Sequence, residues 1–304
     1  MPGVSRKVTL IGVPMDLGAS KRGAAGGPNA IRLAGVMRHL EALGVEVEDG
    51  GDVPVPKRKP QVGHPSMKFR SAIHKVCEET AKRVLEAHED GRTPVVLGGD
   101  HSLAMGSVAG TAKFLSQEKK NLGLIWVDAH GDINTPKSSP SGNVHGMPLA
   151  HILGLDSNLG AIMGKGPKVQ ARNVCLIGIR DVDASERLNL RESGVKVFTM
   201  KDIDRHGMAS VVDQALEIAS DHTDGIHVSY DIDAVDPAIA KGTGTPSRGG
   251  LTYRESHLLM ELVADSDLLV SMDMVEINPM EDVQNQTAGL ASELIQSALG
   301  KRIY

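Results

Sequence analysis

The chain contains few cysteines and few aromatic residues. Cys77 and Cys175 are the only cysteines among 304 residues, and aromatic residues make up 2% of the sequence. Two cysteines argue against a disulfide framework, and because both lie in apolar stretches we expect them to be buried thiols. The core must therefore be built mainly from aliphatic side chains and the 13 Met residues.

Long apolar runs and long runs of one charge are also missing. No segment approaches the ~20 apolar residues of a membrane helix, and the apolar run 8–13 is too short for a signal peptide. The 33 basic and 38 acidic residues give a net charge of −5, without a broad basic face for nucleic acid. The densest basic cluster, 57–59, lies between two prolines and is predicted to be a solvated loop. We expect a cytoplasmic protein that binds neither membranes nor nucleic acids.

Short apolar runs alternate with amphipathic stretches along the whole chain. This pattern predicts a βαβ series with a mostly parallel sheet, but it does not distinguish a closed barrel from an open sheet. No linker or change of composition divides the chain, so residues 1–304 are predicted to form a single domain. The predicted strands are 8–14, 45–47, 94–97, 122–127, 174–179, 195–198, 226–230 and 268–277, and the predicted helices include 30–43, 73–85, 258–263 and 288–299.

Polar residues cluster after three of the predicted strands. The sequences are Gly98-Gly99-Asp100-His101-Ser102, Asp128-Ala129-His130-Gly131-Asp132 and Asp231-Ile232-Asp233. Residues two apart on a strand share a face, so Asp128 and His130 can point to one place, and so can Asp231 and Asp233. Each cluster alone is equally typical of a turn or a helix cap. Three such clusters in one βαβ chain indicate a shared site.

The six side chains of these clusters have the chemistry of a metal site. Four neighbouring carboxylates would repel one another and take up protons unless cations balance them. Two divalent ions bridged by carboxylates satisfy that requirement. A carboxylate and imidazole set without thiolate suits manganese better than structural zinc. The predicted metal ligands are His101, Asp128, His130, Asp132, Asp231 and Asp233.

Together, these three motifs resemble the signatures of the ureohydrolase family, and the resemblance extends from Val8 to Gly300. Within that family the chain is most similar to the arginases of bacterial type. The segments 134–136, 141–148 and 178–183 look like arginase and unlike agmatinase. The segments 21–28 and 241–246 depart from the usual family pattern, but neither contains a predicted metal ligand.

The resemblance implies a three-layer αβα fold with an open, mostly parallel eight-stranded sheet and helices on both faces. It also implies two Mn²⁺ ions per subunit and a trimer or hexamer. One ion would be held by His101, Asp128, Asp132 and Asp231, and the other by His130, Asp128, Asp231 and Asp233. In this scheme Asp128 and Asp231 bridge the two ions.

Further positions match the family by motif. His145 is similar to its proton-shuttle histidine, and Glu276 to the carboxylate that receives the guanidinium group. The predicted contacts with the α-carboxylate are Asn134, Ser141 and Asn143, those near the α-amino group are Asp183 and Glu186, and Thr245 and the ligand His130 are also placed against the substrate. Three other histidines, His39, His74 and His88, lie on predicted helices and are expected to be solvated.

The resemblance implies hydrolysis of L-arginine to L-ornithine and urea by a hydroxide that bridges the two Mn²⁺ ions. Metal coordination ionises water far more easily than bulk solvent does. Asp132 would accept a hydrogen bond from the hydroxide and pass its proton toward the leaving amine. Two alternatives stay open: a ureohydrolase of agmatine or another guanidino compound, and a non-catalytic metal-binding regulator on the same scaffold.

Overall fold

The computed structural model describes residues 6–60, 63–156, 158 and 160–302. Eight parallel strands form one sheet in the order β2-β1-β3-β8-β7-β4-β5-β6. Because β2 and β6 are its two edges, the sheet is open and not a closed barrel. The strands are β1 Lys7–Val13, β2 Glu46–Asp52, β3 Thr93–Gly98, β4 Gly123–Val127, β5 Val174–Ile179, β6 Lys196–Thr199, β7 Ile226–Asp231 and β8 Leu269–Val275.

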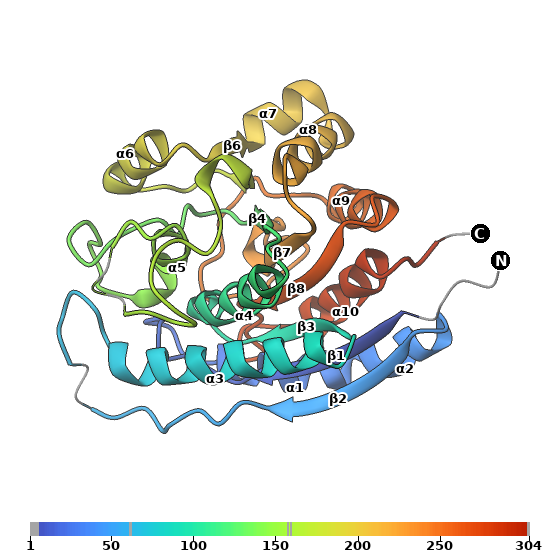
Figure 1. Ribbon diagram of the computed structural model, residues 1–304, viewed down its shortest axis with the longest axis horizontal. Coiled ribbons are helices and arrows are strands. Elements are labelled where there is room, and N and C mark those ends of the chain that lie inside the picture. Colours follow the sequence, from blue (N-terminus) through green and yellow to red (C-terminus); the bar gives the residue numbers. More distant parts are fainter. Residues whose placement is uncertain (1–5, 61–62, 157, 159, 303–304) are drawn as a thin grey trace.

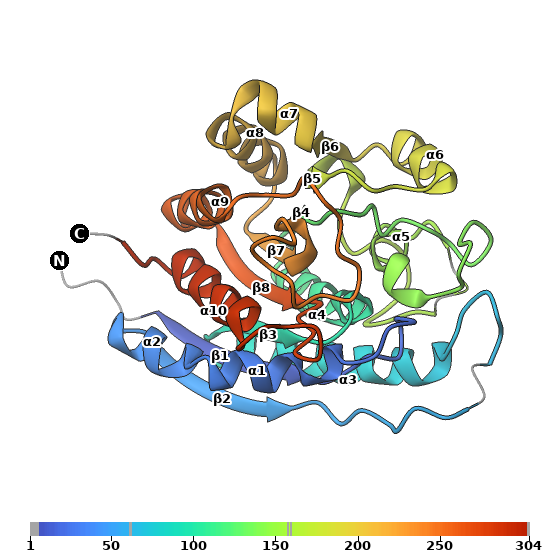
Figure 2. The same ribbon diagram turned by 180° about the vertical axis from the view of Figure 1, so that it is seen from behind.

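Helices cover both faces of the sheet. Helices α3, α4 and α5 lie on the face toward the viewer in Figure 1, and α1, α2, α8, α9 and α10 lie on the face toward the viewer in Figure 2. The predicted three-layer αβα architecture is therefore confirmed. The helices are α1 Gly27–Leu33, α2 Val36–Ala42, α3 Arg70–Glu89, α4 Ala104–Gln117, α5 Pro148–Ile152, α6 Ala184–Ser193, α7 Met200–His206, α8 Met208–Ser220, α9 Tyr253–Asp265 and α10 Gln286–Ala298.

The edge strand β2 differs from its prediction. Its sequence is polar and largely exposed, and it extends to Asp52, well beyond the predicted run 45–47. Main-chain pairing with β1 holds it in the sheet. Arg32 also forms ion pairs with Asp49 (2.8 Å) and Asp52 (2.6 Å), which tie β2 to α1. An edge strand needs no apolar pattern, so a search for apolar runs detects only its beginning.

Two predictions about helical segments were wrong, one on the length of a helix and one on the exposure of a histidine. The predicted helix 30–43 is broken into α1 and α2 at Gly35, whose φ of 83° lies in the left-handed region. His88 is buried instead of solvated: its Nε2 lies 3.2 Å from Thr111 Oγ1, and its ring stacks on Phe114. Burial, together with the nearby charge of His227, lowers the pKa of His88 to about 4.

Both cysteines are buried free thiols, as predicted. Burial raises the pKa of both and brings that of Cys175 to about 12. These thiols are therefore poor nucleophiles. Within the described residues, no helix is long and apolar enough to cross a membrane.

Candidate metal centre and adjoining pocket

The predicted metal ligands lie at the carboxyl ends of neighbouring central strands. Strands β3, β8, β7 and β4 are adjacent in the sheet. His101 follows β3, Glu276 follows β8, Asp231 ends β7 and Asp128 follows β4, and all four are at most 3% exposed. A parallel sheet brings these four chain segments to one edge, where open α/β sheets bind their ligands.

The His101 side chain is held in a fixed orientation. Its ring stacks on Trp126 at 4.0 Å between centroids, and its Nε2 lies 2.8 Å from Ser229 Oγ. The other ring nitrogen, Nδ1, is buried and makes no hydrogen bond, although it lies 3.0–3.2 Å from oxygens of three carboxylates. A buried imidazole nitrogen without a hydrogen bond, surrounded by carboxylates, fits a metal ligand. These carboxylates belong to Asp128, Asp132 and Asp231.

The Ser229 hydroxyl determines which nitrogen of His101 is free. Ser229 Oγ donates to Asp273 Oδ1 at 2.5 Å. Since an ionised carboxylate only accepts hydrogen bonds, the Ser229 proton is committed to Asp273, and Ser229 must accept from His101 Nε2. The Nδ1 lone pair then faces the carboxylate cluster. Burial alone would raise the pKa of Asp273, but the charge of His227 and its hydrogen bond bring it below its usual value.

A second group of donors surrounds His130. Its Nδ1 lies 3.4 Å from Asp128 Oδ1 and 3.1 Å from Asp233 Oδ2. Among the described residues, two sets of donor atoms lie within 4.8 Å of one another: one from His101, Asp128 and Asp231, and one from Asp128, His130 and Asp233. Asp128 belongs to both sets. The geometry is thus suited to two adjacent cations that share a carboxylate.

The charges of the cluster also favour cations. Burial and the charges of Asp233 and Asp128 raise the pKa of Asp231 well above its usual value. Burial and the charge of Asp128 likewise raise the pKa of Asp132. These carboxylates therefore compete for protons when no cation is near. Divalent ions would remove that conflict, so the donor set fits the metals that its sequence predicts.

Two carboxylates at the site have unusual backbone conformations. Asp132 has a φ of 49° and Glu276 a φ of 61°, both in the left-handed region that non-glycine residues rarely occupy. Such conformations cost of order 1–3 kcal/mol and cluster at functional sites. The loops after β4 and β8 therefore hold these two carboxylates in place at an energetic cost.

The carboxylate of Glu276 makes hydrogen-bond contacts with residues from two other segments. Its Oε1 accepts a hydrogen bond from the backbone N–H of His101 at 2.9 Å and lies 3.0 Å from His145 Nδ1. Burial alone would lower the pKa of His145, but the hydrogen bond and charge of Glu276 and the charge of Asp132 raise it to about 9. In the metal-free protein this shift favours the protonated form of His145, which lies beside the carboxylate cluster.

A pocket of about 130 Å³ opens above the cluster. It contains most of the predicted site residues, together with Ser139, Pro140 and Gly146, which the sequence analysis did not single out. Of the remaining predicted residues, Glu276, His101, Asp128 and Asp233 are buried, at most 2% exposed. The lining residues are His130, Asp132, Asn134, Ser139, Pro140, Ser141, Asn143, His145, Gly146, Asp183, Glu186, Asp231 and Thr245.

Hydrogen bonds between the predicted substrate contacts shape this pocket. Asn134 Nδ2 donates to Asp183 Oδ2 at 2.8 Å, and Thr245 Oγ1 donates to Asp233 Oδ2 at 2.8 Å. Asp183 also caps α6 by accepting from the backbone N–H of Glu186 at 2.9 Å. Burial and the charge of Asp132 raise the pKa of Glu186 to about 8. Asp183 and Glu186 thus serve the helix as well as the pocket.

Two residues that the sequence analysis missed support Asn143. Its Oδ1 accepts from Lys68 Nζ at 3.1 Å, and its Nδ2 donates to Ser20 Oγ at 2.8 Å. Neither Ser20 nor Lys68 belongs to a motif, and both lie far from Asn143 in the sequence. Only the packing of the loops after β1 and before α3 against the loop 134–143 reveals them.

Known proteins resemble this chain over nearly its whole length. The model of the Arginase family matches residues 6–300. An arginase of Brevibacillus brevis is 46% identical over 301 residues, covering 99% of this chain and 100% of that protein, and an arginase of Bacillus caldovelox is 45% identical over 98% and 99%. A solved structure of an arginase from Bacillus caldovelox superposes with a TM-score of 0.94 at 44% identity, covering 98% of this chain and 100% of that one. An arginase structure from Bacillus cereus gives 0.92 at 45%, covering 99% and 100%.

Proposed function

The chain belongs to the arginase family, and from this premise we propose that it hydrolyses L-arginine to L-ornithine and urea with two Mn²⁺ ions bound per subunit. The observation that carries the proposal is the convergence of two imidazoles and four carboxylates beneath a small polar pocket. The free Nδ1 of His101, held toward three carboxylates, supports a metal at this point.

The proposed ligands divide into two sets that share carboxylates. His101 and Asp132 would hold one ion, His130 and Asp233 would hold the other, and Asp128 and Asp231 would contribute to both. When bound, the ions lower the pKa of water and so supply the nucleophile for hydrolysis. Mixed carboxylate and imidazole donors without thiolate suit Mn²⁺ and are a poor match for a structural zinc site.

The other residues bind the substrate and transfer protons. Glu276 receives the planar guanidinium group, for which a carboxylate is a bidentate partner. Because Glu276 contacts His145 in the absence of substrate, the arriving guanidinium releases this imidazolium. His145 can then transfer a proton to or from solvent, to which its side chain is 18% exposed. Asp132, at the boundary of cluster and pocket, accepts a proton and passes it toward the leaving amine.

The far end of the pocket distinguishes the substrate. Asn134, Ser141 and Asn143 offer hydrogen-bond donors that suit an α-carboxylate, and Asp183 and Glu186 offer carboxylates near the α-amino group. Thr245 donates a hydrogen bond to Asp233, a proposed metal ligand. This bond links a proposed substrate contact to the metal site. Agmatine has the same guanidinium and carbon chain as arginine but lacks the α-carboxylate.

The proposal is tested by measuring kcat/KM for arginine and agmatine. A hydrogen bond to a charged group contributes about 1.5–3 kcal/mol, so the Asn134→Ala/Ser141→Ala double variant should lose roughly two orders of magnitude or more on arginine and little on agmatine. Ser116→Ala, which removes an exposed hydroxyl on α4, is the control. A preference of the parent enzyme for agmatine would favour the alternative guanidino substrates.

Metal content provides the second half of the test. The active protein should contain two Mn²⁺ ions per chain, and chelation should abolish urea release until Mn²⁺ is returned. One ion per chain in fully active protein would contradict the dinuclear site. If the metal-loaded protein released urea from neither substrate, a non-catalytic binding role would replace the enzyme.

We also propose that residues 1–304 form one domain, because strands from both ends of the chain join the same sheet. The trimer or hexamer and the cytoplasmic location stay predictions.

A further inference from the structure

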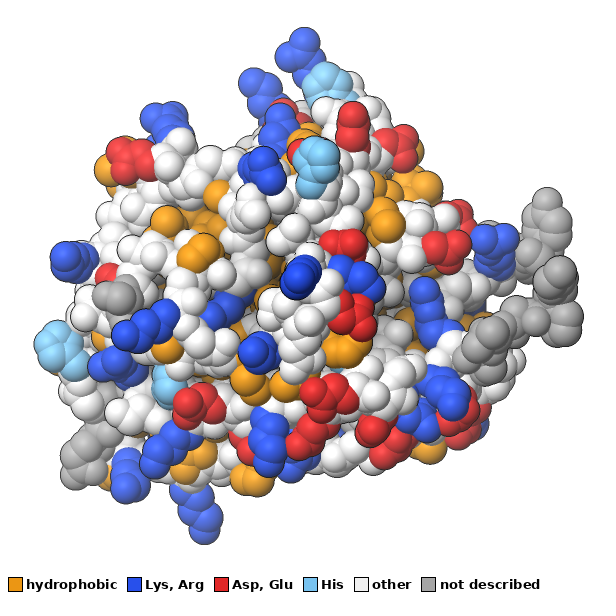
Figure 3. All heavy atoms as spheres, viewed as in Figure 1, with side chains coloured by type: hydrophobic (Ala, Val, Ile, Leu, Met, Phe, Trp, Pro, Cys, Tyr) orange, Lys and Arg blue, Asp and Glu red, His pale blue; other side chains and the backbone are white. Residues whose placement is uncertain are grey.

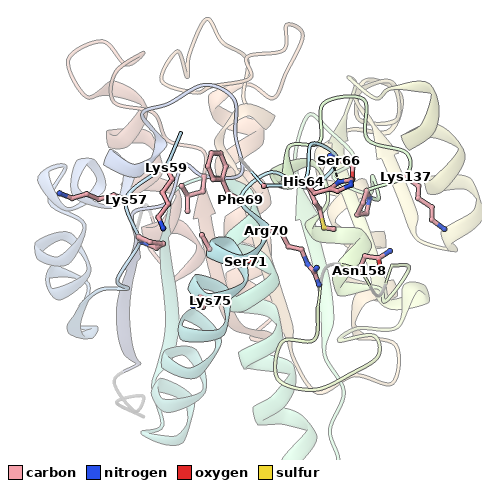
Figure 4. A pocket seen from close by; sticks show the side chains of 16 residues that line it. Lys57, Lys59, His64, Ser66, Phe69, Arg70, Ser71, Lys75, Lys137 and Asn158 are labelled. Atoms are coloured by element: carbon pink, nitrogen blue, oxygen red, sulfur yellow. Dashed lines mark hydrogen bonds between the residues drawn. The ribbon is translucent and has the colours of Figure 1, made fainter. Parts of the chain in front are cut away.

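A second, larger pocket lies outside the proposed active site. Its volume is about 760 Å³, and it shares no lining residue with the pocket above the carboxylate cluster. It lies between the segment before α3, the first turns of α3 and the loop 134–143 (Figure 4). Its size is that of a site for an organic ligand. The proposed reaction makes no use of it.

The lining of this pocket carries a strong excess of positive charge. Five of its side chains are Lys or Arg, and none is Asp or Glu. Figure 4 shows Lys57 and Lys59 on one side of the pocket and Lys137 on the other, with Arg70 between them. Figure 3 shows Lys and Arg side chains on the left of the molecule, where Figure 1 places the amino-terminal end of α3. The five cations are Lys57, Lys59, Arg70, Lys75 and Lys137.

The lining of the pocket offers these five cations no carboxylate partner. None of the five forms an ion pair with a described residue, whereas Arg32 and Arg92 near β2 each pair with two carboxylates. A protein of net charge −5 has carboxylates to spare. The predicted solvated loop 57–59 therefore forms part of a basic pocket, with Lys57 and Lys59 in its lining. An anionic ligand would supply the missing counter-charge.

The pocket also has an apolar floor and a fixed cation beside it. Leu17, Met67 and Phe69 line it, and all three are buried. The guanidinium of Arg58 lies over the Phe69 ring at 4.8 Å and donates to the carbonyl of Asp16 at 3.0 Å. A ligand with an apolar part as well as several negative charges makes use of both features. A simple inorganic anion uses only the charges.

We propose that this pocket binds a small organic polyphosphate of the nucleoside di- or triphosphate type. Phosphate groups would contact the Lys and Arg side chains, and the organic part would lie against the apolar floor. Because the five cations are exposed, the affinity should fall steeply as salt is added.

Two connections link the pocket to the proposed active site. Lys68 lies between the lining residues Met67 and Phe69. Its Nζ donates a hydrogen bond to Asn143 Oδ1, and its backbone N–H donates to the Gly142 carbonyl at 3.0 Å. The lining residue Leu17 precedes Gly18, whose carbonyl accepts from the backbone N–H of His145 at 3.3 Å. A bound polyphosphate would also cancel positive charge that repels cationic arginine. We therefore expect occupancy to lower the KM for arginine and leave kcat unchanged, an effect that rests on the proposed function.

Binding is tested on the manganese-loaded protein by titration calorimetry with MgATP as the probe, in excess Mg²⁺ so that the nucleotide does not remove the metal. MgATP should bind saturably at one site per chain, and Lys59→Ala/Lys75→Ala should weaken it roughly tenfold. Lys113→Ala, an exposed and unpaired lysine on α4, is the matched control and should bind as the parent does. Adenosine and orthophosphate should bind much more weakly than MgATP.

Each other outcome overturns part of the proposal. Absence of saturable binding refutes the site, and equal affinity in the double variant places the nucleotide elsewhere. Binding of anionic vesicles or of long polyphosphate without MgATP binding assigns the surface to a macromolecule instead. An unchanged KM at saturating MgATP refutes the link to the active site. If MgATP binds as expected but no urea forms from arginine, the proposed function fails and the binding site stands.

Discussion

Replacing Asp273 by Asn should weaken metal binding without touching a proposed metal ligand. Asp273 lies on β8, is fully buried and accepts three hydrogen bonds from residues of α4 and β7. They come from Ser229 Oγ (2.5 Å), Ser107 Oγ (2.5 Å) and His227 Nε2 (2.9 Å). Asn has almost the same shape but only one accepting oxygen, and its NH₂ group can only donate. At least one of the three donors therefore loses its acceptor.

The magnitude follows from these contacts. A buried hydrogen bond to a charged group contributes about 1.5–3 kcal/mol, so the fold should lose stability of this order. The effect on the metal comes through Ser229, whose hydroxyl is no longer committed to a carboxylate and can donate to His101 Nε2 instead. His101 then places its proton on Nδ1, the atom proposed to bind the metal. Loss of such an outer hydrogen bond typically costs 10–100-fold in metal affinity, or ~1.4–2.7 kcal/mol.

The assay is competition for Mn²⁺ with a chelator of known affinity, combined with urea denaturation of the metal-free protein. Asp273→Asn and Ser229→Ala should both lose Mn²⁺ affinity. Ser271→Ala is the matched control: its hydroxyl belongs to the same network through His227 Nδ1 but does not contact His101 or Asp273. If Asp273→Asn lost stability but kept its Mn²⁺ affinity, the network would be structural only and would not control the position of the His101 proton.

Two further predictions concern the proposed site itself. Asp231→Ala removes a carboxylate proposed to serve both ions, whereas His101→Ala removes one donor from one ion. Asp231→Ala should therefore lower metal occupancy and turnover more than His101→Ala does. Equal losses of bound Mn²⁺ per chain in the two variants would contradict the bridging role. The pKa of His145 is raised to about 9 from an ordinary 6.5. The pairing of His145 with Glu276 therefore stabilises the metal-free fold fully below pH 6.5. This stabilisation is lost as the pH rises through about 9. Glu276→Gln should flatten this pH dependence of the free energy of unfolding and return the His145 titration, followed by NMR, toward 6.5; a steep dependence that persists in the variant would rule out the pair as its source.

Much of the fold could be predicted from the sequence because the central strands are apolar and buried. Strand β5 was predicted with the bounds that the structure has, and β1, β3, β4 and β7 to within two residues. The proposed metal ligands were found for a related reason, since polar clusters directly after such strands stand out. The open sheet was not predictable from this pattern alone; it followed from the family resemblance.

The features that sequence reasoning missed depend on contacts between distant segments. Lys68 and Ser20 support Asn143 across gaps of 75 and 123 residues. Helix 30–43 was predicted as continuous because Gly35 is compatible with a helical pattern until its φ is known. His88 was expected in water because histidine on an amphipathic helix is usually exposed, but Thr111 and Phe114 on α4 cover it.

The central strands β7 and β8 show how the sheet register and the proposed chemistry depend on one pattern. In β8, Ser271 and Asp273 alternate with Met272 and Met274, which belong to the apolar core on the opposite face. The polar pair meets hydroxyl groups of α4, as in the bond of Ser271 Oγ with Thr111 Oγ1 at 2.9 Å. A slip of one residue would turn both polar side chains into the apolar layer and both methionines toward α4. The same slip would withdraw Asp273 from Ser229 and so free the proton that decides the state of His101. The alternation of polar and apolar residues in β8 therefore determines both the register of the strands and whether Nδ1 of His101 is free to bind a metal.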